Sequence, residues 1–319
     1  MEKSAKIYIV DDGFVAEAIA SELESQGYRN ILPVANGPKL TDSVAVDEFF
    51  ARNRPTYAFL PGGKSGGISA NQRYPVDLMR DNILVSCHVF ESAHRQGVRK
   101  LLYLASSCIY PKFSNQPMKV EYLNTGKLEP TNEPYAMAKL AGLSLCRAYR
   151  RQFGDHFISA IPANVFGPGD NFDPEDSHVI AALMRRMHEA KTQNHRDVEI
   201  WGSGQPRREF IFSDDLARAC VFLMETYESE EPVNIGVGRD WSIREIAEMI
   251  REVVGHTGRL TFDPKRPDGM PAKLLDSSQL AQMGWNPKTS IREGLAATYE
   301  WFLQNTADIN GTTDARAFL

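Results

Sequence analysis

Short apolar runs alternate with amphipathic stretches along the first half of the chain. Strand-like runs occupy residues 6–10, 31–34, 57–60, 100–105 and 157–161. Between them, apolar side chains recur every three or four residues, which predicts helices at 15–26, 42–52, 77–96 and 134–153. The run at 100–105 is almost wholly apolar, as expected of a parallel strand that is buried on both faces. Strands that alternate with helices in this way indicate a doubly wound, parallel α/β sheet.

The pattern loosens after residue 165. Shorter elements are separated there by loops rich in Gly, Pro, Asp and Asn, at Gly167–Asp176, Gly202–Arg207 and Asp263–Pro271. We therefore expect a sheet domain at 1–165, a smaller lobe at 166–306 that returns some elements to the sheet domain, and a frayed tail at 307–319. Ligands of a doubly wound sheet bind at the carboxyl ends of its strands, so the lobe is expected to shape a substrate cleft there.

The composition is that of an ordinary globular protein with a mild acidic excess. Among 319 residues, 36 are Lys or Arg and 41 are Asp or Glu, which gives a net charge of −5 without a basic block. Binding to nucleic acid or to a membrane surface is therefore not expected. No window approaches roughly 18 uninterrupted apolar residues, so we expect no transmembrane helix. The four cysteines, Cys87, Cys108, Cys146 and Cys220, form no CxxC pair, which predicts free thiols, no metal site and a reducing, cytoplasmic compartment.

Tyr135 and Lys139 form the first candidate site. They lie four residues apart on the helix predicted at 134–153, so their side chains face the same way. An ammonium group beside a phenol stabilises the phenolate and lowers the phenol pKa from about 10. Tyr135 would then act as an acid or base near neutral pH. Because this spacing also occurs by chance on helix surfaces, the pair alone is weak evidence.

The second candidate site, Ser106-Ser107-Cys108-Ile109-Tyr110, lies at the carboxyl end of the fourth predicted strand. A doubly wound sheet presents catalytic residues at that edge. The Ser106 hydroxyl would hydrogen-bond the same carbonyl oxygen that Tyr135 protonates. The alternative is a serine-rich turn in which Cys108 is a small core residue.

Together, Ser-Ser-x-x-Tyr after the fourth strand and the later Tyr-x-x-x-Lys resemble the extended short-chain dehydrogenase/reductases. Longer stretches between residues 64 and 302 are similar to the GDP-L-fucose synthase branch of that family: Gly66-Gly67-Ile68, Gln116-Pro117-Met118, Leu128–Ala136, Gly167–Phe172, Ser177–Ile180, Trp201–Gly204, Arg208-Glu209-Phe210 and Pro267-Asp268-Gly269. The resemblance implies a Rossmann-type domain at 1–165 that binds a dinucleotide, and a smaller C-terminal lobe that binds substrate. It also implies NADP(H) as cofactor, a GDP-sugar substrate and a homodimer that pairs the helices at 77–96 and 134–153.

The same resemblance implies a two-stage reaction on a GDP-4-keto-6-deoxy sugar. In the family, the sugar exchanges protons at carbons 3 and 5, and the residues that match the thiolate base and the imidazole acid are Cys108 and His178. NADPH then reduces the ketone at carbon 4, with the proton supplied by Tyr135 and with Ser106 and the cofactor-binding Lys139 completing the set. Outside its Ser-His-Val-Ile context, His178 would be interpreted as a surface or capping residue.

Further positions match binding residues of the family. Arg208 matches an arginine that grips the pyrophosphate of the nucleotide sugar, for which a guanidinium fork is suited. Arg186 and Trp201 match the substrate side, with a solvated helix face and a core position as the alternatives. Asn164 matches an asparagine near the nicotinamide, with a turn-former as its alternative, and Gly13 belongs to the cofactor loop.

The chain departs from the family at that loop, which should read Gly-x-x-Gly-x-x-Gly after the first strand. The three positions are Val10, Gly13 and Ala16, and we expect the β-branched Val10 to crowd the tight turn. Asp11 and Asp12 stand where the family usually has His and Arg. Two carboxylates at a helix N-terminus oppose the binding of a pyrophosphate there.

The segment Pro33-Val34-Ala35-Asn36-Gly37, after the second strand, supplies no cation for a 2′-phosphate. These departures predict weak NADPH binding with no preference for NADPH over NADH. Two alternatives to the bifunctional enzyme therefore stay open. One is an epimerase that has lost the hydride step, and the other is a non-catalytic subunit that binds a nucleotide sugar.

Overall fold

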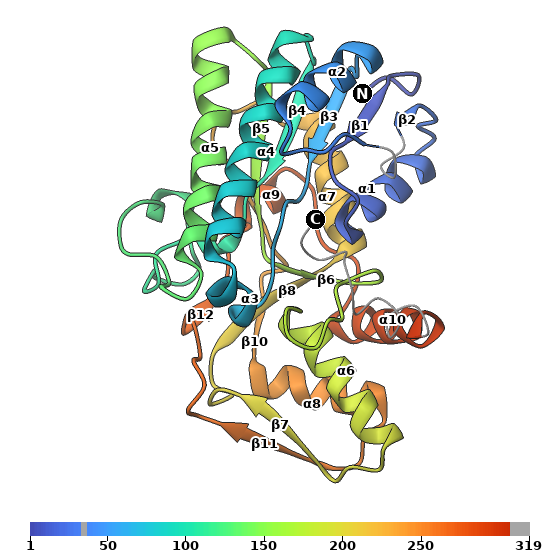
Figure 1. Cartoon of the computed structure of the whole chain (residues 1–319), viewed down its shortest axis with the longest axis vertical. Helices are drawn as coiled ribbons and strands as arrows, with labels where there is room; N and C mark the ends of the chain where they lie inside the picture. Colours follow the sequence, from blue (N-terminus) through green and yellow to red (C-terminus); the bar gives the residue numbers. More distant parts are fainter. Residues whose placement is uncertain (33–36, 307–319) are drawn as a thin grey trace.

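The fold is built on a six-stranded, wholly parallel sheet with the order β2-β1-β3-β4-β5-β9. The structure is a computed structural model that describes residues 1–32 and 37–306 (Figure 1). The strands are β1 (Ile7–Ile9), β2 (Ile31–Leu32), β3 (Tyr57–Leu60), β4 (Lys100–Leu104), β5 (Phe157–Pro162) and β9 (Val233–Ile235). The predicted doubly wound parallel sheet is therefore confirmed. Residues 33 and 34 of the second predicted strand lie outside the described residues.

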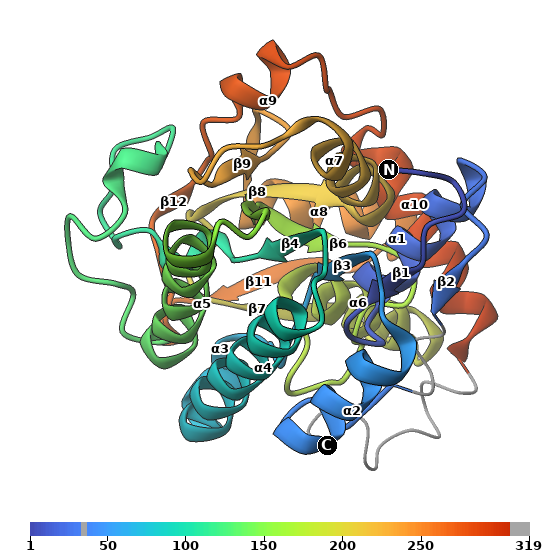
Figure 2. The same ribbon diagram turned by 90° about the horizontal axis from the view of Figure 1, so that it is seen from above.

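Helices cover both faces of this sheet (Figure 2). One face carries α2 (Ser43–Asn53), α4 (Pro75–Arg95) and α5 (Glu133–Phe153), and the other carries α1 (Phe14–Ser25) and α7 (Ser213–Thr226). The four helices predicted in the first half are confirmed, with ends that differ by one or two residues. Asp42, for example, is the N-cap of α2 rather than its first residue, because its side chain accepts two backbone N–H groups of the first turn.

Short segments occupy the connections around the sheet. They are α3 (Ile68–Arg73), η2 (Ser107–Ile109), η3 (Val120–Tyr122) and α9 (Ser278–Gln282). The first two bring side chains to the carboxyl ends of the strands, where the sequence places the candidate chemistry. Within residues 1–32 and 37–306, no helix combines the length and the apolar character needed to cross a membrane.

A smaller lobe lies beyond the carboxyl ends of the sheet (Figure 1). Its central strand β8 (Arg207–Phe212) pairs in parallel with β6 (Asn164–Phe166) and β12 (Ala272–Lys273), and antiparallel with β10 (Asp240–Ser242). A separate parallel pair consists of β7 (Asp197–Trp201) and β11 (Arg259–Asp263). The lobe is completed by α6 (Val179–Thr192), α8 (Ile243–Val254) and α10 (Ile291–Gln304).

Two hydrophobic cores hold these layers together. The core of the sheet contains fully buried residues such as Phe59 and Leu102, and the core of the lobe contains Phe166 and Met184. Helix α7 and strand β9 follow β8 in the chain, yet they pack into the core of the sheet. The chain therefore crosses from sheet to lobe and back, and the pocket forms along this junction.

Candidate active site

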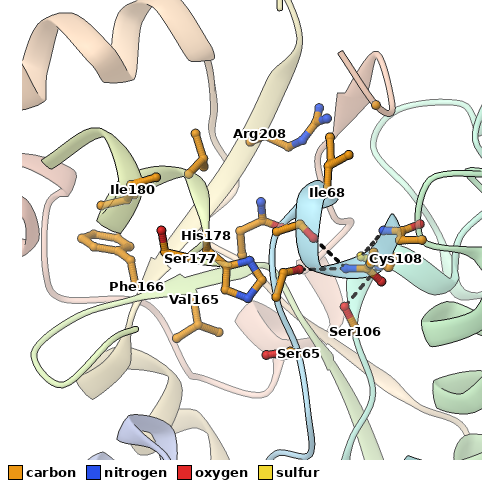
Figure 3. Close-up of a pocket in the computed structure, with 18 of the residues that line it drawn as sticks. Ser65, Ile68, Ser106, Cys108, Val165, Phe166, Ser177, His178, Ile180 and Arg208 are labelled. Atoms are coloured by element: carbon orange, nitrogen blue, oxygen red, sulfur yellow. Dashed lines mark hydrogen bonds between the residues drawn. The ribbon is translucent and has the colours of Figure 1, made fainter. Parts of the chain in front are cut away.

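One cavity of about 440 Å³ lies between the carboxyl ends of the sheet strands and the smaller lobe. Its walls include every residue that the sequence singled out for catalysis or binding: Gly13, Ser106, Cys108, Tyr135, Lys139, Asn164, His178, Arg186, Trp201 and Arg208. Figure 3 shows Cys108 and His178 entering the pocket from two sides, with Arg208 reaching in from the lobe. Residues that are far apart in the chain thus share one cavity.

Ser106 follows the end of β4 as the N-cap of η2 and lies beside Tyr135 at the start of α5. The Ser106 hydroxyl accepts a backbone N–H of the following turn at 3.3 Å and hydrogen-bonds the Tyr135 phenol. Lys139 lies one turn further along α5, and its ammonium donates to the carbonyls of Gly62 at 2.8 Å and Leu104 at 3.2 Å. The chain ends of β3 and β4 therefore hold this ammonium, 6.0 Å from the centre of the Tyr135 ring.

The protonation states of this group differ from the expectation. Burial raises the pKa of Tyr135, the Cys108 thiol adds to this effect, and the Ser106 hydroxyl opposes it. Burial also lowers the pKa of Lys139 to about 8, while the Asp11 carboxylate opposes that shift. The expectation that Lys139 lowers the pKa of Tyr135 is therefore wrong for the free protein, because two backbone carbonyls hold the ammonium and burial of the phenol dominates. Tyr135 is a protonated donor at neutral pH.

Cys108 lies in the turn after β4, where its sulfur meets two donors from other segments. The Lys273 ammonium lies 3.1 Å from Sγ, and the Asn132 side-chain amide lies 3.2 Å from it. Burial alone would raise the pKa of Cys108, but Lys273, the Ser106 hydroxyl and Arg208 outweigh burial and lower it. The pocket therefore favours the thiolate, which is the reactive form of cysteine.

His178 is the N-cap residue of α6, and a close approach of two loops places it in the pocket wall. Gly67 donates its N–H to the Asp176 carbonyl at 3.0 Å. A Cβ atom on Gly67 would lie only 2.6 Å from the Ser177 carbonyl oxygen, so this approach requires glycine. Loss of hydration inside the pocket, together with the Lys273 charge, lowers the pKa of His178 well below its usual value. The imidazole is therefore neutral in the free pocket.

Arg208 projects from β8 into the pocket (Figure 3). Its guanidinium donates to the backbone carbonyls of Arg207 at 2.8 Å and Asp268 at 3.2 Å. A Cβ atom on Gly269, whose φ is +72°, would lie 3.3 Å from Nη2, so the Pro-Asp-Gly turn packs closely against the arginine. Across the residues that the structure describes, no carboxylate forms an ion pair with Arg208, which leaves its charge available to an anionic ligand.

Trp201 lines the pocket, and two arginines lie close to its ring. Its side chain is 38% exposed, which excludes the core position considered from the sequence. The guanidinium carbons of Arg186 and Arg266 lie 5.2 Å and 4.6 Å from the centre of its ring. Arg186 is half-buried and lines the cavity, so it does not belong to a solvated helix face. An indole with guanidinium groups beside it presents both aromatic and cationic surface to a ligand.

The dinucleotide loop has a different geometry from the one expected. Val10 is fully buried and continues β1, because its N–H donates to the Phe59 carbonyl at 2.8 Å. The positive φ, 127°, falls on Asp11 instead. The positive φ expected at Val10 is therefore wrong, because Val10 keeps the direction of β1 and the next residue, Asp11, takes the positive φ. Ala16 is buried in the core beneath α1, where the small side chain allows close packing.

The pocket fits a nicotinamide dinucleotide better at one end than at the other. Tyr135, Lys139 and Asn164 offer hydroxyl, ammonium and amide groups at the end near Cys108, and the Asn164 oxygen lies 3.5 Å from the Ser107 hydroxyl. At the other end, the Asp11 carboxylate lines the cavity where α1 begins. The segment that the sequence leaves without a cation, residues 33–37, lies outside the described residues except for Gly37.

Three residues around this pocket were not predicted from the sequence to be site residues: Asn132, Lys273 and Arg266. Lys273 is separated from Cys108 by 165 positions, and no motif spacing links the two. Asn132 falls inside a stretch that resembles the family, but nothing in that stretch pointed to the sulfur. Within the described part of the chain, no group of three or more His, Cys, Asp or Glu side chains is arranged to hold a metal ion.

Comparisons with known proteins agree with this geometry. Residues 11–236 match the NAD dependent epimerase/dehydratase family. An Arabidopsis thaliana protein described as a putative GDP-L-fucose synthase 2 is 51% identical, over 96% of this chain and 94% of its own length. GDP-L-fucose synthase from Escherichia coli K12 is 47% identical, over 94% of this chain and 96% of its own. The structure of a GDP-L-fucose synthetase from Naegleria fowleri bound to NADP is similar with a TM-score of 0.86 and 27% identity, over 95% of this chain and 96% of that one. The chain therefore belongs to the NAD dependent epimerase/dehydratase family, within the extended short-chain dehydrogenase/reductases that its motifs resemble.

Proposed function

We propose that this chain acts on a GDP-4-keto-6-deoxy sugar, epimerises it at carbons 3 and 5 and then reduces the ketone at carbon 4 with NADPH. The observation that carries the proposal is the convergence of a thiol–ammonium pair, Cys108 and Lys273, with the Ser106-Tyr135 hydroxyls in one cavity. Relatives described as GDP-L-fucose synthases, 47% and 51% identical to the chain, support the same assignment.

Epimerisation needs a base and an acid beside an acidified C–H bond. In the proposed step, the Cys108 thiolate takes a proton from the carbon next to the ketone, and the electron pair of the broken bond moves onto the ketone oxygen. The Ser106 and Tyr135 hydroxyls hydrogen-bond that oxygen as it gains charge. The negative charge favours protonation of the neutral His178 imidazole by a proton from solvent, and the imidazolium delivers that proton to the other face of the same carbon. The Cys108 thiol then releases its proton to solvent, which restores the thiolate.

Reduction uses the same hydroxyl pair. When bound, the nicotinamide cofactor supplies the hydride that reduces carbon 4. Tyr135 donates its phenolic proton to the ketone oxygen, and the raised pKa of Tyr135 keeps that proton in place at neutral pH. Lys139, held at the ends of β3 and β4, provides a fixed positive charge near the hydroxyl groups of this end of the pocket.

The nucleotide part of the substrate is assigned to the lobe. Arg208 has no carboxylate partner among the described residues and offers a guanidinium fork for the pyrophosphate. Trp201, with Arg186 beside it, offers an aromatic face on which a base can stack. The exchange chemistry and the nucleotide contacts therefore meet along one cavity.

The proposal is tested by solvent deuterium exchange at carbons 3 and 5 of GDP-4-keto-6-deoxymannose, followed by NADPH-dependent formation of product. We expect exchange in the wild type and its loss in Cys108→Ser. The matched control is Cys87→Ser, which changes an exposed thiol outside the pocket and should leave exchange unchanged. Absence of exchange and of reduction in a folded wild type that still binds GDP would favour a non-catalytic binding subunit.

We infer that the chain forms a homodimer through α4 and α5. These neighbouring helices expose the apolar side chains Val76 and Met79 on α4 and Met137 on α5. A two-fold pairing of both helices would cover these side chains in a four-helix interface. Light scattering at micromolar concentration should give twice the mass of the chain, and a monomer would contradict the inference.

We also infer a reducing, cytoplasmic location. All four cysteines are free thiols, and two of them, Cys146 and Cys220, are buried in the core of the sheet. Scattered free thiols are typical of proteins from reducing compartments. Fluorescence microscopy of the tagged chain in its own cells would test the location.

A further inference from the structure

The crevice between β1 and β3 is the place where the strand order of the sheet reverses. In doubly wound sheets, a dinucleotide crosses such a crevice and its pyrophosphate lies against the N-terminus of the first helix. Here Asp11 follows β1, Gly62 and Gly63 follow β3, and α1 begins at Phe14 with Gly13 as its N-cap. The N-cap residue of α1, Gly13, has no side chain that could accept a hydrogen bond. The N–H groups of the first turn therefore face the crevice without a side-chain cap.

The Asp11 carboxylate occupies this crevice. One of its oxygens, Oδ2, accepts the backbone N–H of Gly63 at 3.1 Å, and the other accepts the N–H of Asp12 at 2.9 Å. The side chain thus bridges the ends of β1 and β3 with the kind of contact that a phosphate oxygen makes to backbone N–H groups. Asp11 holds this position at a φ of 127°, which a non-glycine residue rarely adopts.

Gly62 provides the space for this carboxylate. A Cβ atom on Gly62 would lie 1.8 Å from Asp11 Oδ2, so no other residue fits at position 62 while the carboxylate stays in place. The φ of Gly62 is not in the positive region, and its backbone does not by itself require glycine. The glycine and the aspartate therefore form one matched feature.

Charges near Asp11 act on its side chain in opposite directions. The Lys139 ammonium, which donates to the Gly62 carbonyl at 2.8 Å, attracts the Asp11 carboxylate. Asp12 is exposed and repels it. Burial outweighs its two N–H donors and Lys139, so the pKa of Asp11 is raised above its ordinary value. A second anion in the same crevice would meet the carboxylate at short range with little water to screen the two charges.

We propose that the Asp11 carboxylate is an internal occupant of the cofactor-phosphate site, and that a nicotinamide dinucleotide binds to this chain only by displacing it. The choice of ligand rests on the proposed function. The free energy needed to displace one side chain therefore sets the affinity for the cofactor. That side chain belongs to Asp11 and not to Asp12 or Val10.

The first test is a titration with NADPH. Binding is measured by calorimetry and by energy transfer from tryptophan to the nicotinamide. Asp11→Asn keeps the shape and removes the charge, and Asp11→Gly removes the side chain and suits the positive φ. We expect both variants to bind NADPH at least tenfold more tightly than the wild type, a gain of about 1.4 kcal/mol. The matched control, Asp12→Asn, removes the same charge one residue away and should change the affinity less than threefold.

The second test needs no cofactor. Gly62→Ala introduces the Cβ atom that would collide with Asp11 Oδ2, so it should lower the melting temperature of the wild type. In the Asp11→Gly background the collision partner is absent, and the same substitution should have little effect. Equal losses in the two backgrounds would mean that the carboxylate does not lie against Gly62, which overturns the proposal.

GDP serves as the control ligand in both sets of variants, because its proposed contacts are at Arg208 and not at Asp11. If GDP binds all variants equally while NADPH affinity stays unchanged in Asp11→Asn and Asp11→Gly, the internal occupant is refuted and the proposed function stands. If the Asp11 variants bind NADPH at least tenfold more tightly than the wild type but the wild type fails to bind GDP, the proposed function fails and the inference about Asp11 stands.

Discussion

The two ends of the pocket follow the family pattern to different degrees. At the reaction end, Ser106, Cys108, Tyr135 and Lys139 match the expected side chains and share one cavity. At the phosphate end, which comprises Asp11, Gly13, Gly62 and Gly63, two of the three expected loop glycines are replaced and a carboxylate faces the cavity. The loop nevertheless keeps its tight turn, because Asp11 adopts the positive φ.

This difference separates two kinds of constraint. At the reaction end, the chemistry needs particular functional groups. A sequence motif that specifies those side chains therefore predicts where the reaction end lies. At the phosphate end, the ligand meets backbone N–H groups, and the backbone can keep its path while the side chains change. A changed motif at such a loop therefore indicates a changed ligand contact more than a changed fold.

The largest effect expected at the reaction end is that of Tyr135→Phe. The substitution removes the proposed proton donor of the reduction and should lower its rate about 10²–10⁴-fold. NADPH oxidation measures the loss, and circular dichroism should show an unchanged fold because only a hydroxyl is removed. Tyr149→Phe, which removes a hydroxyl from the same helix outside the pocket, should keep its activity. Reduction near the wild-type rate in Tyr135→Phe would break the assignment of this end.

The next effect concerns the binding of the nucleotide by Arg208, which lines the same pocket. Arg208→Ala should weaken GDP binding by about 2–4 kcal/mol, because it leaves pyrophosphate charge unpaired. Calorimetry gives the affinity directly. Arg207→Ala is the matched control, since its neighbouring guanidinium pairs with Asp240 and Glu245 outside the cavity. Similar losses in both variants would show that general charge, not the Arg208 site, holds GDP.

A smaller effect, about tenfold, is expected for Lys273→Met. The ammonium 3.1 Å from Cys108 lowers the pKa of the thiol, so the wild-type thiolate forms at lower pH than an ordinary cysteine. Without Lys273 the pKa of Cys108 should rise, and alkylation of Cys108 at neutral pH should slow about tenfold.

Iodoacetamide labelling from pH 6 to pH 10, read by peptide mass spectrometry, gives this profile, with Cys87 as the internal reference. Lys112→Met, which removes a lysine that pairs with Glu129, is the control. An unchanged labelling profile of Cys108 in Lys273→Met would mean that other groups set its reactivity.

The last effect concerns stability rather than activity or binding, and it involves a third carboxylate near the phosphate end. Asp170 is buried, and burial raises its pKa to about 7 from an ordinary value of 3.8. The folded state therefore holds a proton that the unfolded state loses, and stability falls by up to about 1.4 kcal/mol per pH unit between these two values. Asp170→Asn should melt near the wild-type temperature at pH 4 and several degrees higher at pH 8. A constant difference across that range would contradict the assignment.

Much of the sheet domain was predictable because its signals are local. Helical periodicity and nearly continuous apolar runs located the strands and helices up to β5, and errors at the ends come from caps such as Asp42. The pairings of the lobe were not predictable. Its strand β12 has only two residues, Ala272 and Lys273, and it is defined by pairing with β8 far earlier in the chain. A strand of that length carries no periodicity to detect.

The candidate site could be predicted where a sequence motif specifies the side chain. The resemblance located Cys108 and Tyr135, but the ammonium of Lys273 reaches the sulfur only through the β8–β12 pairing. The geometry at Asp11 was missed for another reason. Counting back three residues from Gly13 placed the positive φ at Val10, whereas Val10 still donates a hydrogen bond to Phe59 and the positive φ lies at Asp11.

The return of the chain to the sheet has a consequence for synthesis on the ribosome. Strand β5 pairs with β9 on its outer edge, and β9 emerges only after β6, α6, β7, β8 and α7 have been made. Until then the nascent sheet carries an unpaired edge strand, and α1 lacks the helix α7 that packs beside it. Unpaired edges invite association with other chains. The first half of this sequence is therefore not a folding unit that an engineer could express or transplant alone.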